Sequence, residues 1–418
     1  MLGSDTLVGG WINGLDLGVY DRTSFYTTFI IEIDLSDEGF ENVDEVLLLT
    51  FAWIKLISDK GIDEESFKSF KTMNQLKFDY WDSSAGLLEE LSQLAVSLKD
   101  ADSKDVLRAT LTVDEYDEAL IKSYIARLAP NNSVLMLSSP RFEGNYTSKS
   151  ALNLVPVDQY DKLYRMNYTV HKIDKSFLEK LENVSYLAYP DLAVPNNTNP
   201  YTPVSLCNKK VKRSSTESLR QALQEPFQAN YSFGSLFYQK DTSFKVPKIN
   251  GNFYFQSLIS ANNATIQAKW LVLCTAFDTN IQDIIGLADE AGYGVSIGCH
   301  GKGLDLTIHG WTEKYESVMS DVLTAFVEAK QELSEAIFTG LKSGVTVELY
   351  NQKKSLLFQR ALGKLAYFQS KDEFLEDELL QAISGLTYEE WQRSVEQLSQ
   401  QLRVEAIMIG GAEKKDFT

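Results

Sequence analysis

The apolar and polar residues between positions 250 and 312 follow successive patterns that predict an α+β unit. Residues 252–260 are rich in aromatic and β-branched side chains, which predicts a strand. Apolar residues then recur at helical spacing over residues 261–291, and Asn262 or Asn263 occupies the position of an N-cap. The segment therefore begins with a strand and a long helix.

Two further strands are predicted at residues 293–300 and 304–311, on either side of Gly301, Lys302 and Gly303. The two glycines can supply the positive φ that a tight hairpin needs. The order of elements is therefore a strand, a long helix, an antiparallel hairpin and further helices. Elements in this order fold into a sheet with helices over one face. This pattern predicts one half of an α+β sandwich.

The first part of the chain has a similar pattern. Residues 24–35 predict a strand, Ser36 offers a cap for a helix over residues 38–58, and Gly61 ends that helix. Beyond Gly61 we expect helices at 63–80, 87–98 and 113–128, and a buried strand at 133–138.

A duplication explains this similarity, because four consecutive elements recur at offsets of about 270 to 278 residues. The paired segments are 26–33 with 304–311, the helix after Ser36 with 315–330, 63–80 with 334–351, and 112–139 with 387–411. The first copy lacks a counterpart of the opening strand and long helix. We therefore expect the sequence to start inside a domain, with apolar surface exposed near residues 11–31 and a tendency to self-association.

All nine prolines lie between Pro130 and Pro247, and the proline-free regions on either side suit long helices. This distribution predicts a surface connector over residues 141–228, least ordered near 196–219. A basic run at residues 209–213 is interpreted as a solvated loop, with a processing site or a localisation signal as alternatives.

The predicted fold class is α+β, with two homologous sandwich-type domains. Each domain is a mainly antiparallel sheet covered by long helices, and a long proline-containing connector joins the two. The predicted parts are an incomplete first domain, the connector and a second domain, at residues 1–140, 141–228 and 229–418.

Composition narrows the possible functions. The 418 residues carry a net charge of −18, which disfavours binding to nucleic acid or to an anionic membrane surface. No stretch approaches 18 uninterrupted apolar residues, so no membrane span is predicted. The start MLGSDTLVGGW has no basic region leading into an apolar core, so no signal peptide is predicted either. Three cysteines are too few for a disulfide framework or a zinc knuckle.

Seven Asn-x-Ser/Thr sequons would allow N-glycosylation in a secreted chain. In an asparagine- and serine-rich sequence such matches are more often accidental, so the cytoplasm is the expected compartment and the secretory pathway is the alternative. The seven asparagines are Asn131, Asn145, Asn167, Asn183, Asn196, Asn230 and Asn263.

No catalytic constellation emerges from the residues. His171, His300 and His309 are the only histidines, and the last two are predicted too far apart on the hairpin to share a metal. Cys299 and His300 are neighbours in a strand and point to opposite faces. Ser296 lies in a G-x-S-x-G pattern, but a strand follows it where a nucleophile elbow needs a helix. We interpret that pattern as strand glycines, with a serine hydrolase as a remote alternative.

Short segments along the whole chain nevertheless resemble the middle of an insulysin/pitrilysin zinc metallopeptidase. They occur in the family's order and are 11–13, 29–31, 34–39, 142–144, 236–241, 252–255, 287–293 and 404–406. The resemblance implies four homologous α+β domains in two halves that enclose a chamber. It places this chain over most of the second domain, the connector and the third domain. The inverted H-x-x-E-H zinc motif of the first domain is not present here.

The resemblance also implies a peptide exosite, where the N-terminal residues of a substrate add as a strand to a sheet edge. An ordinary edge strand is the alternative interpretation. The corresponding residues are Asn13, Gly14, Leu15, Asp16, Leu17, Gly18 and Val19. Leu17 and Val19 depart from the glycine and glutamine that the family often has, which puts the side-chain specificity in question.

Two functional hypotheses follow from the resemblance. The chain is a non-catalytic central portion of a zinc metalloendopeptidase, forming chamber wall and exosite, and it cleaves peptides only with a first and a fourth domain supplied in cis or in trans. Alternatively, it is an inactive peptide-binding or assembly partner of an active subunit. No metal site is expected in this chain, and zinc is expected in the first domain.

Overall fold

The computed structural model divides the chain into two compact units, which are described separately. Unit 1 comprises Met1–Lys68 and Asp114–Asn197, and unit 2 comprises Ser69–Val113 and Thr198–Thr418. The structure describes residues 11–23, 25–81, 87–109, 111–142, 150, 152, 159–192, 199–206, 227–241, 246–257, 263–300, 303–329, 334–370, 374–400 and 402–412.

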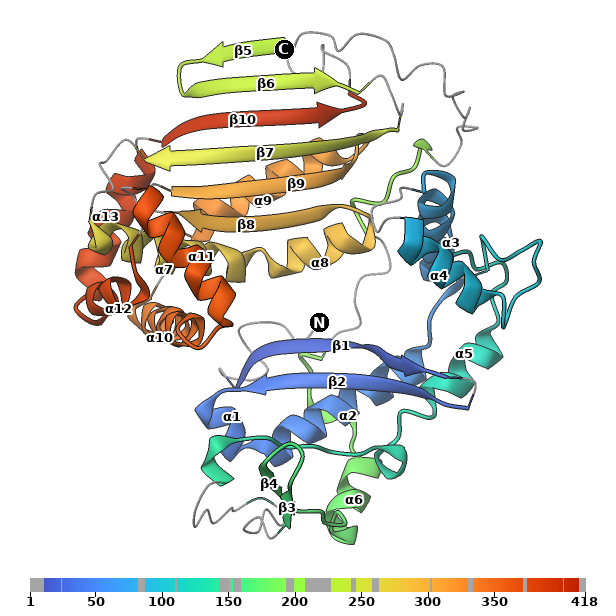
Figure 1. Ribbon diagram of the computed structural model, residues 1–418. Coiled ribbons are helices and arrows are strands. Elements are labelled where there is room, and N and C mark those ends of the chain that lie inside the picture. Colours follow the sequence, from blue (N-terminus) through green and yellow to red (C-terminus); the bar gives the residue numbers. More distant parts are fainter. Residues whose placement is uncertain are drawn as a thin grey trace. The chain divides into compact units, whose positions relative to one another are not determined.

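Unit 2 contains a six-stranded mixed sheet in the order β5-β6-β10-β7-β9-β8 (Figure 1). Strand β10 runs parallel to β6, and every other neighbouring pair in this sheet is antiparallel. The strands are β5 (Phe227–Tyr231), β6 (Gly234–Lys240), β7 (Lys248–Ser257), β8 (Gly294–His300), β9 (Gly303–Trp311) and β10 (Leu402–Gly410). The predicted strands at 293–300 and 304–311 are confirmed. The strand predicted at 252–260 is part of β7, which begins earlier, at Lys248; residues 258–260 lie outside the described residues.

At the described end of the β8–β9 hairpin, glycine is required because two backbones approach closely, and not because φ is positive. A Cβ added to Gly303 would lie 1.8 Å from the carbonyl oxygen of Phe255 on β7, so only glycine lets these two backbones approach. Gly303 does not have the positive φ that we expected. Gly301 lies outside the described residues.

Helices follow the strands of unit 2 and bury the apolar side of the sheet. Helix α7 (Ala264–Asn280) contacts β8, β9 and five other helices. The remaining helices of this part are α8 (Gln282–Glu290), α9 (Tyr315–Ala329), α10 (Glu335–Gln352), α11 (Leu357–Gln369), α12 (Glu376–Ser384) and α13 (Tyr388–Gln400). Trp270 on α7, Trp311 on β9 and Trp391 on α13 are among the largest fully buried side chains.

The helix predicted over residues 261–291 is two helices. Asn263 caps α7 as expected, since its side chain accepts a hydrogen bond from the N–H of Thr265. The backbone leaves helical geometry at Ile281, with φ −98° and ψ 4°, and α8 continues at an angle of 52°. The Ile281 side chain is fully buried, so the core fixes the position of this break. Among the described helices none alone is long and apolar enough to cross a membrane, although α7 and α8 together meet that test of length and composition.

Unit 1 contains an antiparallel pair, β1 (Ile12–Arg22) and β2 (Thr27–Leu35), followed by α1 (Asp37–Glu41) and α2 (Val43–Lys60). Ser36 caps α1 by accepting from the N–H of Gly39 at 3.1 Å, as predicted. The single predicted helix is interrupted at Asn42. Gly61 ends α2 with φ +72°, which confirms the predicted stop.

The remaining helices of the first part are α3 (Glu64–Asp79), α4 (Leu87–Ser97) and α5 (Glu118–Ile125). The division between the units falls within α3. The buried strand predicted at residues 133–138 is wrong, because Val134 is 95% and Met136 90% exposed and the segment is not in a strand. The segment that the predicted duplication pairs with it, β10, lies between two strands, whereas unit 1 has no neighbouring strand for residues 133–138 among the described residues.

The region predicted as a surface connector includes regular structure. It contains the hairpin β3 (Gln159–Asp161) and β4 (Met166–Tyr168), and the helix α6 (Lys175–Glu182). Phe177 and Leu181 of α6 are each 2% exposed and form a small core with Phe51 of α2. Most of the segment 196–219, predicted as least ordered, lies outside the described residues.

Candidate functional site

The seven predicted exosite residues all lie in β1, whose only strand neighbour among the described residues is β2. Leu15 pairs with Ile33 and Leu17 with Ile31. Register shifts at the positions of Asn13 and Tyr20 bracket the regular segment 14–19. One edge of that segment therefore faces β2, and the other edge has no partner strand in the part of the chain described.

Side chains of β1 alternate between the two faces of this ribbon. Leu15 and Leu17 share a face with Phe29 and Ile31 of β2, and these four side chains line a cavity of about 150 Å³. The rest of the lining consists of Thr50, Trp53, Ile54 and Ile57 of α2, with Ile125 and Leu128. Thr50 is the only polar residue in this lining, so the cavity suits aliphatic or aromatic side chains.

The apolar face is partly open to solvent, as the sequence predicted for residues 11–31. Leu15 is 44%, Leu17 46% and Val19 60% exposed. Phe29 on β2 is 39% exposed. Strand β1 thus combines an edge without a partner strand in the described ranges with a row of partly exposed apolar side chains, which are the features that strand addition requires.

The opposite face of β1 carries small and polar residues. Gly18 is open, because a Cβ built there meets no atom within 4 Å. A Cβ at Gly14 would lie 3.0 Å from the carboxylate of Asp34. Asp16 is exposed on the same face. The apolar cavity lies on the other face, that of Leu15 and Leu17, so any selection of side chains is expected there.

The turn that joins β1 to β2 is held by local hydrogen bonds. The hydroxyl of Tyr26 donates to the Asp21 carboxylate at 2.8 Å, and this bond raises the pKa of Tyr26. The hydroxyl of Thr23 accepts from the N–H groups of Phe25 and Tyr26. These bonds fix the register that places Leu15 and Leu17 beside Phe29 and Ile31.

The G-x-S-x-G pattern is a packing feature of the β8–β9 hairpin. A Cβ at Gly294 would collide with the ring of His309, and one at Gly298 would lie 2.6 Å from the Asp305 carboxylate. Both glycines thus leave room for β9 side chains on the face that Ser296 shares. Ser296 lies in the middle of a strand, opposite Thr307. The interpretation as strand glycines is confirmed, and the geometry of a nucleophile elbow is not present.

The histidines do not converge on a metal site. His300 pairs with Asp305 at 3.3 Å, and the β8–β9 register places His300 and His309 at opposite ends of the hairpin. His171 lies in unit 1 and contacts Thr169. In the described part of the chain no group of three or more histidine, cysteine, aspartate or glutamate side chains could hold a metal ion. These residues therefore do not fit the zinc that the resemblance implies.

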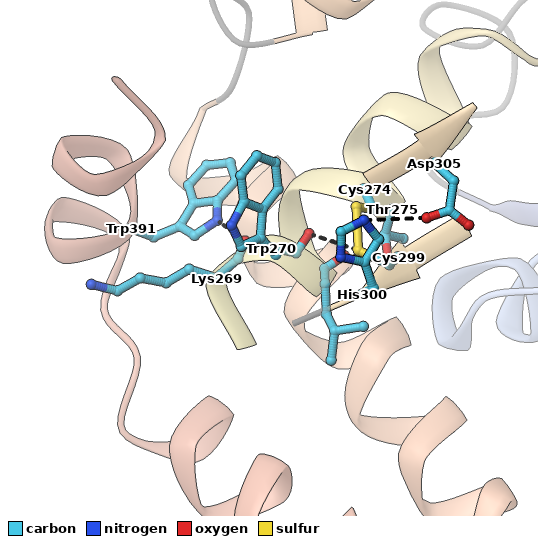
Figure 2. Close-up of a disulfide and its surroundings, with 9 residues drawn as sticks. Lys269, Trp270, Cys274, Thr275, Cys299, His300, Asp305 and Trp391 are labelled. Atoms are coloured by element: carbon cyan, nitrogen blue, oxygen red, sulfur yellow. Dashed lines mark hydrogen bonds and ion pairs between the residues drawn. A yellow bond between two sulfur atoms is a disulfide. The ribbon is translucent and has the colours of Figure 1, made fainter. Parts of the chain in front are cut away.

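A disulfide joins Cys274 of α7 to Cys299 of β8, with their Cα atoms 6.3 Å apart (Figure 2). Figure 2 also shows His300 directed toward Asp305, beside the disulfide. Three cysteines predict no disulfide framework, and their spacing did not reveal this single bond. The available signal was one cysteine on the apolar side of a predicted helix and one on the apolar side of a predicted strand.

The sequence matches the family described as the middle or third domain of peptidase M16 over residues 78–382. The chain therefore belongs to the M16 peptidases, the insulinase-like metallopeptidase family, and corresponds to a central portion of its members. The matched range covers α4 to most of α12 and begins after the β1 edge.

Two curated relatives align over 97% of this chain. It is 25% identical to insulin-degrading enzyme-like 1, peroxisomal, of Arabidopsis thaliana and 22% identical to insulin-degrading enzyme of Homo sapiens. The chain spans 40% and 38% of those proteins. The crystal structure of pitrilysin has a TM-score of 0.63 at 19% identity, over 97% of this chain and 41% of that chain. The fold is therefore that of the corresponding part of pitrilysin.

Proposed function

We propose that this chain is a non-catalytic central portion of an insulinase-like peptidase, and that β1 binds an extended peptide as an added strand. The observation that carries the proposal is the edge of β1 that has no partner strand among the described residues and lies beside an apolar cavity. Backbone hydrogen bonds to the edge supply affinity, while the cavity selects apolar side chains at alternate positions of the peptide.

The predicted duplication supports the outer edge of β1 as the free edge of the β1–β2 pair. By that duplication β8 and β9 of unit 2 correspond to β1 and β2, and β9 is an interior strand of its sheet while β8 ends it. By this correspondence, β2 would pair with a further strand in the complete domain, as β9 pairs with β7 in unit 2. The outer edge of β1 stays accessible to a peptide.

The proposed organisation follows the predicted boundaries. Residues 1–140 form an incomplete second domain, 141–228 a connector and 229–418 a third domain of an M16 peptidase. Together these three parts form part of the wall of a chamber that holds peptides. Zinc and the general base are assigned to a first domain outside this chain, because the described residues do not fit a zinc site. That domain and a fourth domain act in the same polypeptide or as partner chains.

An inactive binding or assembly partner of an active peptidase is the second candidate. The exposed apolar residues of unit 1 favour it, since large apolar side chains in solvent are typical of surfaces that another chain covers. Val134, Met136 and Phe25 are each at least 90% exposed. This candidate shares the β1 peptide site and differs in having no catalytic domain in its own polypeptide.

Metal content and peptide cleavage test the non-catalytic role. The 418-residue chain is expected to contain far less than one zinc per molecule and to leave a quenched fluorescent peptide uncut, with or without chelator. The physical reason is that zinc peptidases need three protein ligands and a bound water, which the described residues do not assemble. Chelator-sensitive cleavage with one zinc per chain would contradict the proposal.

A further inference from the structure

The seven sequons exceed what the composition alone predicts. The sequence has 20 asparagines and 62 serines and threonines among 418 residues, from which about three sequons are expected by chance. Five of the seven lie in the described part of the chain, and their asparagines are all exposed. A glycan on any of them would extend into solvent without displacing the core. Asn145 and Asn196 lie outside the described residues.

Asn131 and Asn167 differ from the other three in that their side chains make no hydrogen bond within the described part of the chain. Asn131 lies in the short 3-10 turn Pro130–Asn132, where the sequon hydroxyl of Ser133 donates to the carbonyl of Pro130 at 2.8 Å. Asn167 lies on β4 of a two-stranded hairpin, opposite Tyr160. Neither amide nitrogen has an acceptor among the described residues. Each could therefore carry a sugar without the loss of a hydrogen bond.

The other three described sequons are compatible with the modification. Asn230 and Asn263 use their side-chain oxygens as acceptors, and an N-linked amide keeps that oxygen. Asn183 donates from its amide nitrogen to the carbonyl of Glu179 at 2.8 Å. An N-linked amide keeps one N–H, so this helix-terminal bond can persist.

The disulfide supplies an independent indication of the compartment. Cys274 is 6% exposed, and its bond to Cys299 ties α7 to the end strand of the sheet. Disulfides of this kind form and persist in oxidising compartments and are rare where thiol reductants are abundant. The compartment that oxidises secreted proteins is also the one that glycosylates sequons.

We propose that this protein is N-glycosylated, first at Asn131 and Asn167, in a secretory compartment that also oxidises Cys274 and Cys299. In the glycosylation, the side-chain nitrogen of asparagine forms a bond to the anomeric carbon of an oligosaccharide carried on a polyisoprenyl diphosphate. The bond from that carbon to the diphosphate oxygen breaks, the diphosphate leaves, and the transferase base takes one amide proton. In the oxidation, the two thiols give two electrons and two protons to a protein disulfide, which becomes a dithiol.

The test is peptide mapping of the full protein purified from its source cells. Enzymatic deglycosylation in heavy-oxygen water is expected to convert Asn131 and Asn167 to labelled aspartate. Asn132, which is not in a sequon, is the internal control and stays asparagine. A non-reducing digest is expected to contain the peptide pair linked through Cys274 and Cys299.

Two matched variants separate glycosylation from folding effects. Thr169→Ala removes the sequon at Asn167, and its electrophoretic mobility is expected to increase by the amount that corresponds to one glycan. Thr169→Ser keeps the hydroxyl and therefore the glycan. Unmodified asparagine at every sequon in the purified protein overturns the proposal, whatever the state of the cysteines. If Cys274 and Cys299 are free thiols in protein that is alkylated at lysis, the proposal of an oxidising compartment is overturned.

Discussion

Replacing Leu17 by aspartate is expected to weaken the binding of an extended apolar peptide by about 10- to 100-fold, or about 1.4 to 2.8 kcal/mol. Leu17 lies on the edge strand and lines the apolar cavity. An added strand would cover its exposed 46% and bury that surface. A carboxylate at this position would have to lose its hydration without gaining a partner. Fluorescence anisotropy with a labelled peptide of alternating valine and threonine measures the change.

The matched control for Leu17 is Gly18→Ala on the same strand. Its added methyl group meets no atom within 4 Å and lies on the opposite face of the ribbon. Because the backbone edge and the cavity are unchanged, we expect the peptide affinity to stay within about twofold of the original. Equal losses in the two variants would show that the cavity does not select side chains. An unchanged affinity in Leu17→Asp would also contradict the proposed site.

Replacing Trp391 by alanine is expected to destabilise unit 2 by about 3 to 5 kcal/mol. Trp391 is 1% exposed on α13, and its ring lies 5.2 Å from that of Phe338 on α10. Its indole N–H donates to the carbonyl of Lys269 on α7 at 3.2 Å. Alanine would leave a cavity where three helices meet and would remove the hydrogen bond from the indole to the Lys269 carbonyl. Amide exchange of β7 and β9 under increasing urea measures the loss.

Trp81→Ala is the control for Trp391, because it removes the same side chain from an exposed position. Trp81 is 52% exposed, and its indole N–H donates to the carboxylate of Glu90 at 3.3 Å. Its removal is expected to change the stability of unit 2 by less than about 1 kcal/mol. Similar urea midpoints for the two variants would mean that Trp391 is not part of the core that holds the helices.

Local patterns in the sequence predicted the local structure well. The strands of the β8–β9 hairpin, the cap at Asn263 and the stop at Gly61 each depend on residues close together in the chain. The same holds for the edge strand at residues 13–19, which the resemblance located and the structure places in β1. Short-range propensity and capping chemistry are sufficient for such elements.

Features that depend on distant partners were missed or wrong. Residues 133–138 have the composition of a buried strand, yet a strand needs a neighbour, and none is present in unit 1 as described. The break at Ile281 depends on the core around it rather than on a glycine or proline. The cavity beside β1 follows from the register of Leu15 and Leu17 on β2, which no sequence period specifies. The bond between Cys274 and Cys299 likewise depends on how α7 lies on the sheet.

Amide hydrogen exchange of β1, with and without the alternating valine–threonine peptide, tests the central claim most directly. An added strand donates and accepts hydrogen bonds at every second residue of the edge. We therefore expect exchange to slow by at least about tenfold at the outward-facing amides of residues 14–19 when the peptide is saturating. Exchange at β8 should stay unchanged. Bound peptide with no added protection in residues 14–19 would contradict the assignment of β1 as the peptide-binding edge.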